Sequence, residues 1–325
     1  MNERRHGVVG QAVLVMHDDQ VVFRGARGVA DTATHRPSRP DDLFPVFSVA
    51  KLFTSILVMQ LVERGEVDPS QPVGRYVADL PPRWRAVTVQ QLLDHVSGLP
   101  DYFEQNRTTA FPATAKAMFA SLANHELLFA PGTQVRYTQT NYVILGALLE
   151  AHHGKPYRQI AAERIFEPLG MTSTYLGRRN VPAAKLVTSY RGNAGGAGLD
   201  RLYDWPEYSF VHVELFTTID DLGRFVTAVR TGKLVKPDTL LRRWHQYRLT
   251  DGGVSYWGSG WEVDPHGDER RVGHDGGEVV RVMLVFTDSL ARGTYTYIYL
   301  TNGSTTNVWT RTLIESLMPI ATKSR

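Results

Sequence analysis

The segment from Val49 to Val62 constrains the fold most, because its apolar residues point in nearly every direction around a helix axis. It stops at Glu63-Arg64-Gly65, and a glycine in this position is typical of a helix end. A helix that is apolar all round is buried. We therefore predict a buried helix here, and the 325 residues of the chain are enough to enclose it, in two lobes.

Ser48 and Lys51 lie at the start of this helix, three positions apart. Such residues share a helix face, so the Lys51 amine can reach the Ser48 oxygen. A serine hydroxyl is a weak nucleophile at neutral pH and needs a proton acceptor. Burial favours a neutral amine and would lower the Lys51 pKa below its usual value of about 10.4. The pair is typical of an acyl-transfer site, and a simple helix cap at Ser48 is the structural alternative.

The composition excludes several classes of protein. Lys and Arg exceed Asp and Glu only by 36 to 33, and no basic run with interleaved aromatic residues indicates nucleic-acid binding. The lack of cysteine excludes disulfides, thiolate nucleophiles and cysteine-ligated zinc. The longest apolar runs are too short to span a membrane. Polar residues from Met1 to His6 lead directly into a strand pattern, so we expect no signal peptide in this chain. The protein is then cytoplasmic, or it is periplasmic or secreted after removal of a leader.

The periodicity of apolar residues predicts an α+β fold, with an antiparallel sheet flanked by helices and an inserted all-helical lobe. Residues 1–65 and 182–325 would form the sheet lobe, and residues 66–181 the helical lobe. We expect strands at 8–16, 21–29, 259–263, 279–287 and 294–302, and further helices at 89–95, 114–128, 142–152, 157–166, 218–230 and 308–317. The glycine-rich stretch 191–198 is expected to be a loop.

Two further clusters contain residues suited to chemistry. Tyr137 follows a Pro-Gly turn, and a nearby ammonium would favour its phenolate form, which makes it a candidate general base. His274 and Asp275 lie among glycines that let the backbone pass close to a bound group. The structural alternatives are a packing tyrosine, a glycine turn or bulge, and a metal pair at His274-Asp275.

Three short motifs resemble those of serine β-lactamases and penicillin-binding proteins, in the same order and with similar spacing. They are Ser48-x-x-Lys51, Tyr137-Thr138-Gln139 and His274-Asp275-Gly276. Segments at 92–100 (Leu-Leu-Asp-His-Val-Ser-Gly-Leu-Pro), at Pro131-Gly132 with Asn141-Tyr142, and at 167–171 (Glu-Pro-Leu-Gly-Met) are also similar to family sequences. The resemblance covers about residues 8–317 and is closest to the class C β-lactamase branch, with its esterase and D-amino-acid peptidase relatives.

This resemblance implies an antiparallel sheet, a helical lobe and a reactive serine in the cleft between them. It implies that Ser48 is acylated and that Lys51 and Tyr137 relay its proton. The backbone N–H groups of Ser48 and Gly277 would form an oxyanion hole, in which each donor is typically worth about 3 kcal/mol in the transition state. Gln139 would orient the lysine and the substrate, and the third motif, from His274 to Gly276, would contact the incoming acyl group. The family needs no metal or organic cofactor, so the expected partner is a small-molecule or short-peptide substrate. The oligomeric state stays open.

Three positions depart from the family pattern. Gln139 stands where the second motif usually ends in Asn, and turnover would suffer if the longer amide sits differently. Asp275 replaces a Thr, Ser or Gly that helps to bind a substrate carboxylate, and Glu214 lies where relatives often have Gly-Gly. Because like charges repel, these acids predict a preference for neutral or cationic acyl substrates. If Asp275 is already paired with His274 or with an arginine, its charge no longer predicts this substrate preference.

Rival functions follow from other motifs. An α/β-hydrolase would need a Gly-x-Ser-x-Gly elbow, which the chain lacks. A metal hydrolase would need clustered ligands, but His152-His153 has no His-Glu-x-x-His pattern and precedes a helix-ending Gly154. Within the family, a D-alanyl-D-alanine carboxypeptidase or β-lactamase remains the alternative, as does a non-hydrolytic acylated sensor or scaffold.

Overall fold

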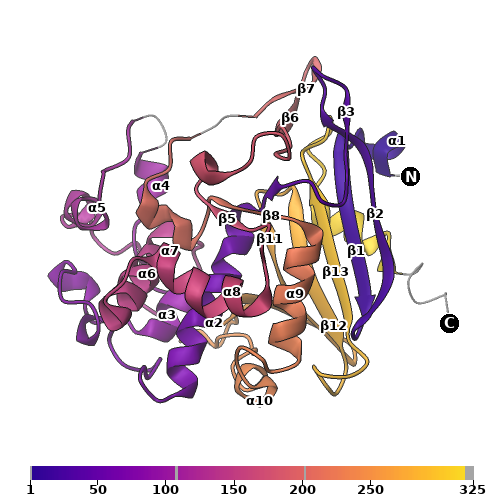
Figure 1. The fold of residues 1–325 in the computed structure, drawn as a ribbon. Helices are drawn as coiled ribbons and strands as arrows, with labels where there is room; N and C mark the ends of the chain where they lie inside the picture. The colour runs from indigo at the N-terminus through magenta and orange to yellow at the C-terminus, as the bar shows by residue number, and fades with distance from the viewer. Residues whose placement is uncertain (1, 107–108, 201–202, 319–325) are drawn as a thin grey trace.

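An eight-stranded antiparallel sheet forms one side of the protein in the computed structural model, which describes residues 2–106, 109–200 and 203–318. The strand order is β3-β2-β1-β13-β12-β11-β10-β9. The strands are β1 (Gly10–His17), β2 (Gln20–Asp31), β3 (Arg36–Pro37), β9 (Trp257–Gly258), β10 (Trp261–His266), β11 (Glu269–Gly276), β12 (Val280–Phe286) and β13 (Tyr295–Thr301). The first and last parts of the chain thus meet at the centre of the sheet, where β1 pairs with β13 (Figure 1).

The helices and short helical turns fill the rest of the fold. The α-helices are α1 (Asn2–His6), α2 (Ala50–Glu63), α3 (Val89–Leu93), α4 (Tyr102–Gln105), α5 (Ala115–Leu122), α6 (Gln139–His153), α7 (Tyr157–Ala161), α8 (Glu167–Leu169), α9 (Ile219–Arg230), α10 (Pro237–Leu241) and α11 (Thr310–Glu315). The 3-10 turns are η1 (Phe47–Val49), η2 (Val73–Arg75), η3 (Pro82–Trp84), η5 (Arg178–Asn180) and η6 (Glu207–Val211), and η4 (Ala162–Phe166) is a π-helical turn.

Both faces of the sheet are covered by helices. Side chains alternate along each strand, so the strands supply apolar residues to a core on each face. Leu14 and Leu284 point into the main core, where α9 packs on β1 and β13. Val13 and Val285 point to the opposite face, into a smaller core closed by α11. In Figure 1 helices α3 to α7 lie on the left and the sheet on the right, with α2 between them.

The buried helix predicted from Val49 to Val62 is confirmed as α2, whose residues from Ala50 to Leu61 are all buried. The predicted antiparallel α+β architecture is confirmed as well. Helix α6 begins at Gln139, three residues before the predicted start, because the Thr138 hydroxyl accepts a hydrogen bond from the Thr140 N–H and caps it. This earlier start puts Gln139 in the first turn of a helix.

The glycine-rich stretch 191–198 is a hairpin and not the predicted loop. Strands β6 (Tyr190–Asn193) and β7 (Gly196–Leu199) pair with each other. A Cβ atom added to Gly192 would overlap the carbonyl oxygen of Thr305, so this glycine serves close packing of two backbones. Composition alone does not reveal such a contact.

A second, three-stranded sheet joins distant parts of the chain. Strand β8 (Leu215–Thr217) pairs with β4 (Phe44–Pro45) and with β5 (Tyr175–Leu176). Strand β5 lies in the range assigned to the helical lobe, and yet it pairs with β8, which lies outside that range. The division into two lobes stays a prediction. Within the described ranges, no helix is both long and apolar enough to cross a membrane.

Candidate active site

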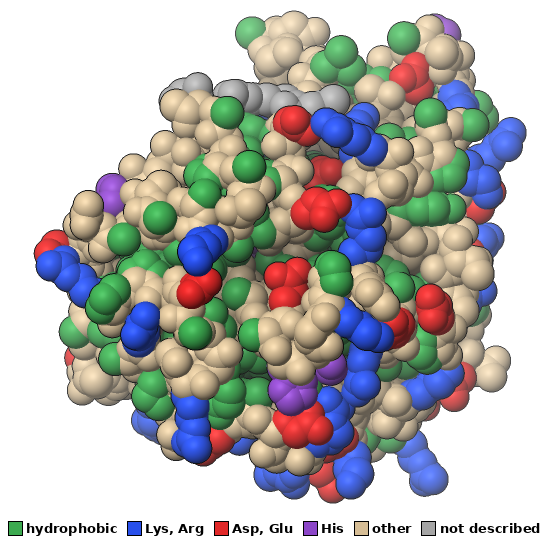
Figure 2. Space-filling view, turned by 60° about the vertical axis from the view of Figure 1, so that its left-hand side comes forward, with side chains coloured by type: hydrophobic (Ala, Val, Ile, Leu, Met, Phe, Trp, Pro, Cys, Tyr) green, Lys and Arg blue, Asp and Glu red, His purple; other side chains and the backbone are tan. Residues whose placement is uncertain are grey.

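A cavity of about 670 Å³ lies at the N-terminal end of α2. Four of the residues proposed from the sequence line it, namely Ser48, Gln139, Glu214 and Gly277. On the face of the molecule drawn in Figure 2, acidic and basic side chains are interspersed and form no single charged patch. A substrate would therefore be recognised by its direct contacts with the cavity wall and not by a charged surface around it.

Ser48 and Lys51 meet as the helical spacing predicts. Ser48 lies in the 3-10 turn η1, directly before α2, and its Oγ is 3.2 Å from Lys51 Nζ. The preceding residue, Phe47, has a positive φ of 47°, a conformation that an L-residue adopts only under constraint. Strained backbone next to a nucleophile is typical of active sites.

Three oxygen atoms surround the buried Lys51 amine. Besides Ser48 Oγ, they are Gln139 Oε1 at 2.7 Å and the carbonyl oxygen of His212 at 3.4 Å. Burial lowers the pKa of Lys51 well below its usual value, and the nearby Asp101 carboxylate opposes this shift only in part. A neutral amine has two N–H groups, which satisfy Gln139 and His212. Its lone pair is then free to accept the Ser48 proton.

Tyr137 packs against the same amine. Lys51 Nζ is 4.8 Å from the centre of the Tyr137 ring, and the ring contacts His95 and Trp257 at centroid distances of 4.4 and 5.5 Å. The Tyr137 hydroxyl lies beside Ser48, which acts to lower its pKa, although the two groups make no hydrogen bond of ordinary geometry. Burial is the larger influence and raises the Tyr137 pKa well above its usual range.

The phenolate expected for Tyr137 is therefore not supported. That expectation needed an ammonium at Lys51, but burial disfavours the charged forms of both groups. Tyr137 is a neutral phenol in the resting enzyme, so it is suited to donate a proton and not to remove one.

The third motif lies within β11 and turns toward Ser48 at its end. His274 is buried, with its Nδ1 beside the carbonyl oxygen of Asp275, and burial lowers its pKa to about 3. Its ring centre is 6.2 Å from that of Tyr137, and it does not line the cavity. A Cβ atom added to Gly276 would overlap the carbonyl oxygen of Val46. This close approach of β11 to the segment before Ser48 puts Gly277 into the cavity wall, with a φ of 55°.

The structure corrects the role expected for Asp275. Its two carboxylate oxygens bind Arg281 Nη1 at 2.6 Å and Arg311 Nη2 at 3.1 Å. Glu262 binds the same two arginines, at 2.9 and 2.6 Å. Because side chains alternate along a strand, His274 faces Tyr137 while Asp275 faces away, toward α11. Asp275 is neutralised by two guanidinium groups and does not line the cavity, so it gives no reason to exclude an anionic substrate.

Glu214 does line the cavity. It has a positive φ of 61°, and its Oε2 accepts a hydrogen bond from the backbone N–H of Arg178 at 2.9 Å. Burial raises its pKa, and this backbone N–H partly opposes the effect. An acid held in a strained backbone conformation at a cavity wall is a candidate for recognising a positively charged or hydrogen-bond-donating group.

Sequence reasoning missed three residues that hold the site together. Asp101 caps α4, and its Oδ1 accepts hydrogen bonds from the N–H groups of Phe103 at 3.0 Å and Gln139 at 3.4 Å. His212 contributes the carbonyl oxygen that binds Lys51. Trp257 packs against both Tyr137 and His274. Asp101 directly follows the 92–100 segment, so its place next to a family motif was a usable signal, whereas the other two had none.

We predict that Asp101→Asn moves the rising limb of the pH dependence of kcat/KM to lower pH. The Asp101 carboxylate favours the Lys51 ammonium, so its removal lowers the Lys51 pKa further, and the neutral base is present at lower pH. Asparagine still caps α4, which preserves the fold. Glu104→Gln is the matched control, because this exposed acid pairs with Arg136. A limb that moves to higher pH in Asp101→Asn would contradict this electrostatic coupling.

No group of three His, Asp or Glu side chains within residues 2–106, 109–200 and 203–318 is placed to hold a metal ion. His152 lies in the last turn of α6 and pairs with Glu66 at 3.1 Å. This contact accounts for His152 as part of a polar, partly exposed helix end.

Comparison with known proteins connects this geometry to a family. The Beta-lactamase family matches residues 2–313. The D-aminopeptidase of Brucella anthropi is 28% identical over 282 residues, which are 82% of this chain and 51% of the relative. Penicillin-binding protein 4* of Bacillus subtilis is 25% identical over 282 residues, 82% of this chain and 62% of the relative. Esterase EstB of Burkholderia gladioli is 30% identical over 188 residues, 53% of this chain and 47% of the relative. The chain thus spans about half the length of the curated relatives it matches.

Solved structures show the same fold. The D-amino acid amidase of Ochrobactrum anthropi SV3, in complex with D-phenylalanine, aligns with a TM-score of 0.80 and 23% identity, over 98% of this chain and 95% of the amidase. The octameric penicillin-binding protein homologue of Pyrococcus abyssi aligns with a TM-score of 0.78 and 23% identity, over 93% of this chain and 71% of the homologue. The predicted β-lactamase/transpeptidase-like fold is confirmed.

Proposed function

We propose that this chain, which belongs to the Beta-lactamase family, is a serine hydrolase that forms an acyl-enzyme on Ser48. One observation supports this most strongly. The Lys51 amine is 3.2 Å from Ser48 Oγ, and its environment favours the neutral form, as a proton acceptor requires. The names of the relatives describe peptidase, esterase and amidase activities, which involve attack on an acyl carbon.

In the acylation step, Ser48 Oγ attacks the carbonyl carbon of the substrate while Lys51 accepts its proton. The backbone N–H groups of Ser48 and Gly277 stabilise the negative charge that develops on the carbonyl oxygen. The carbon–heteroatom bond then breaks, and the leaving alcohol or amine takes a proton from the Tyr137 hydroxyl. The Lys51 ammonium returns a proton to Tyr137. Gln139 and the His212 carbonyl hold the amine in place throughout.

Deacylation repeats these steps with water. A water molecule attacks the ester at Ser48, and the proton that it loses passes to Lys51. The Ser48 oxygen then leaves and takes this proton from the Lys51 ammonium, which restores the hydroxyl and the neutral amine, and the free acid is released. Gln139 supports this cycle despite its departure from the family pattern, because its longer side chain reaches Lys51 at 2.7 Å.

The substrate class that the cavity favours is an ester or amide with a neutral or amine-bearing acyl group. This preference now depends on Glu214, because Asp275 is already paired with two arginines. Arg178 and Arg191 also line the cavity, and Arg191 pairs with Asp200 at 3.2 Å. The positive and negative side chains that line the cavity nearly balance, so the cavity as a whole does not attract one charge. Glu214 therefore acts through direct contact with the substrate.

We predict that Glu214→Gln selectively weakens the use of amine-bearing substrates. For phenylalanine methyl ester, kcat/KM should fall about tenfold, the equivalent of about 1.4 kcal/mol. The N-acetylated ester has no ammonium and should change little. The ratio of the two kcat/KM values at pH 7.5 is the measurement. Equal losses on both esters would mean that Glu214 shapes the cavity without recognising an amine.

A fluorophosphonate probe followed by a time course of deacylation separates this proposal from its rivals. We expect Ser48 to be labelled and nitrophenyl esters to be turned over. Stable acylation without turnover would instead indicate a sensor, and a chain that is not labelled would be a scaffold. Efficient hydrolysis of nitrocefin, faster than that of the esters, would favour the β-lactamase alternative.

A further inference from the structure

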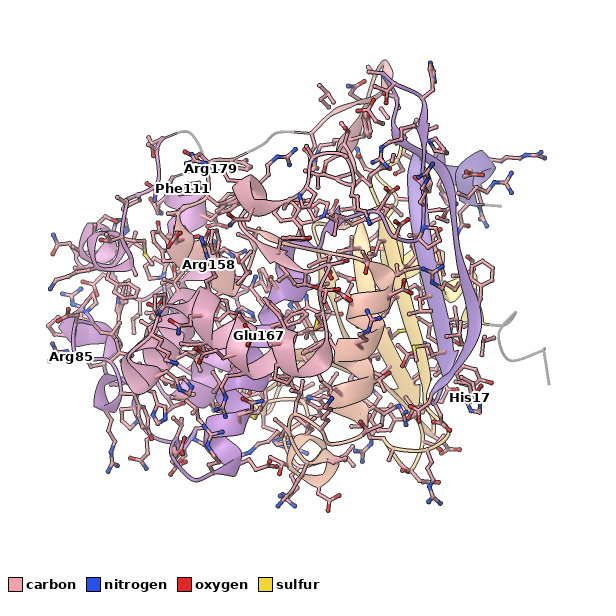
Figure 3. All side chains as sticks on the ribbon, viewed as in Figure 1. His17, Arg85, Phe111, Arg158, Glu167 and Arg179 are labelled. Atoms are coloured by element: carbon pink, nitrogen blue, oxygen red, sulfur yellow. The ribbon has the colours of Figure 1, made fainter. Side chains whose placement is uncertain are left out.

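Four aromatic side chains form a continuous surface beside the cavity, which we call the aromatic wall. They are Phe103, Phe111, Tyr203 and Trp205. The Trp205 ring stacks on Phe111 at a centroid distance of 5.0 Å and an angle of 11°, and on Phe103 at 5.2 Å and 24°. Tyr203 meets Phe103 edge to face at 5.3 Å. Phe111 is labelled in Figure 3, above the helical side of the molecule.

The aromatic wall is open to the cavity. Phe103, Tyr203 and Trp205 line the cavity, and each is only half-buried. Tyr102, the neighbour of Phe103, is by contrast fully buried and serves packing. Flat apolar faces that stay exposed in a concave site are typical of a ligand subsite, because removing them from water stabilises the complex. The wall therefore has a surface available to a bound group.

Two chains of contacts connect the aromatic wall to the catalytic lysine. The Trp205 ring is 5.9 Å from that of His212, whose carbonyl oxygen binds Lys51. The Phe103 N–H shares the Asp101 carboxylate with Gln139, which also binds Lys51. The wall is thus one residue away from the groups that bind Lys51, and it lines the same cavity as Ser48.

We propose that the aromatic wall is a subsite for a planar aromatic ring on the acyl group of the substrate. The preferred substrates are then esters or amides of arylalkanoic acids, in which a phenyl-sized ring stacks on Trp205. This inference rests on the hydrolase function proposed at Ser48. Offset stacking gives an aromatic ring an advantage over a saturated ring of similar size, because the two rings differ in their quadrupole more than in their area.

The test compares three nitrophenyl esters that share one leaving group, namely the phenylacetate, cyclohexylacetate and acetate. We expect kcat/KM for the phenylacetate to exceed that for the acetate by at least about tenfold. The phenylacetate should exceed the cyclohexylacetate by about threefold or more. Trp205→Ala should remove both preferences, and Trp205→Phe should keep most of them. Phe103→Ala should weaken them, whereas Phe23→Ala, at an exposed position on β2 outside the cavity, should not.

A binding measurement tests the aromatic wall without turnover. Calorimetry on Ser48→Ala should show that phenylacetamide binds at least about tenfold more tightly than acetamide, and that adding Trp205→Ala abolishes the difference. Hydrolysis through Ser48 with neither an aromatic preference nor tighter binding of phenylacetamide would overturn the subsite and leave the hydrolase proposal intact. If phenylacetamide binding depended on Trp205 but the wild-type protein turned over none of the esters, the subsite would be supported and the hydrolase proposal contradicted.

Discussion

Replacing Lys51 with methionine should lower kcat/KM for nitrophenyl esters by about 10³-fold. General base catalysis typically contributes 10²- to 10⁴-fold, and Ser48 has Lys51 as its neighbouring proton acceptor at 3.2 Å. Methionine has a similar length and no charge, so it fits a position where the lysine is fully buried. Steady-state kinetics of the purified variant, with circular dichroism as a check of folding, is the measurement.

Lys116→Met is the matched control for this prediction. Lys116 is exposed on α5 and pairs with Asp79, so its loss should leave kcat/KM within about twofold of the wild type. If Lys51→Met kept more than a tenth of the wild-type activity, Lys51 would not be the base. The proton of Ser48 would then have to pass to another group.

Replacing Asp275 with threonine, one of the three residues expected here from the family resemblance, should destabilise the protein by about 2–3 kcal/mol. Breaking a buried ion pair typically costs 3–5 kcal/mol, because it leaves a charge without compensation. The loss here is smaller, since Glu262 still binds both Arg281 and Arg311, and the Arg311 side chain is 46% exposed. Urea denaturation of the two proteins measures the difference.

Two comparisons make this prediction specific. Asp264→Thr changes an exposed acid on the neighbouring strand β10 and should alter the free energy of unfolding by less than about 0.5 kcal/mol. The ratio of nitrocefin to nitrophenyl ester hydrolysis should stay unchanged in Asp275→Thr, because Asp275 does not line the cavity. A stable variant with improved nitrocefin hydrolysis would mean that Asp275 does meet the substrate.

The sequence predicted what depends on local pattern. Helix α2 is apolar on nearly every side, so its burial followed from its residues, and the low pKa of Lys51 followed from the burial. The apolar run in β12 and the alternation in β13 likewise predicted two strands of the sheet. The three-residue spacing also predicted that Ser48 lies beside Lys51, although Ser48 is in the turn η1 and Lys51 is in α2.

The environment of Asp275 did not follow from the sequence. Its partners, Arg281 and Arg311, and the second acid, Glu262, lie on three different elements. Only the register of β11 against β10 and β12, with α11 packed on the sheet, brings the four groups together. A motif that names Asp275 as a neighbour of His274 cannot show that the two side chains point to opposite faces.

Tyr137 illustrates a second limit. Its position near Lys51 was expected, but the direction of its pKa depends on how completely the phenol is enclosed. Trp257 and His95 provide part of that enclosure, and neither is close to Tyr137 in the sequence. Proximity to an amine can be inferred from motifs, whereas solvation depends on the whole tertiary structure.

Mass spectrometry of the quenched enzyme tests the Ser48 acyl-enzyme most directly. The protein is mixed with a slowly hydrolysed nitrophenyl ester, denatured in acid within seconds, digested and mapped. We expect a mass increase equal to the acyl group on the peptide that contains Ser48, and neither this adduct nor ester hydrolysis in Ser48→Ala. Hydrolysis that persists in Ser48→Ala, or an acyl group attached only to another residue, would contradict the account.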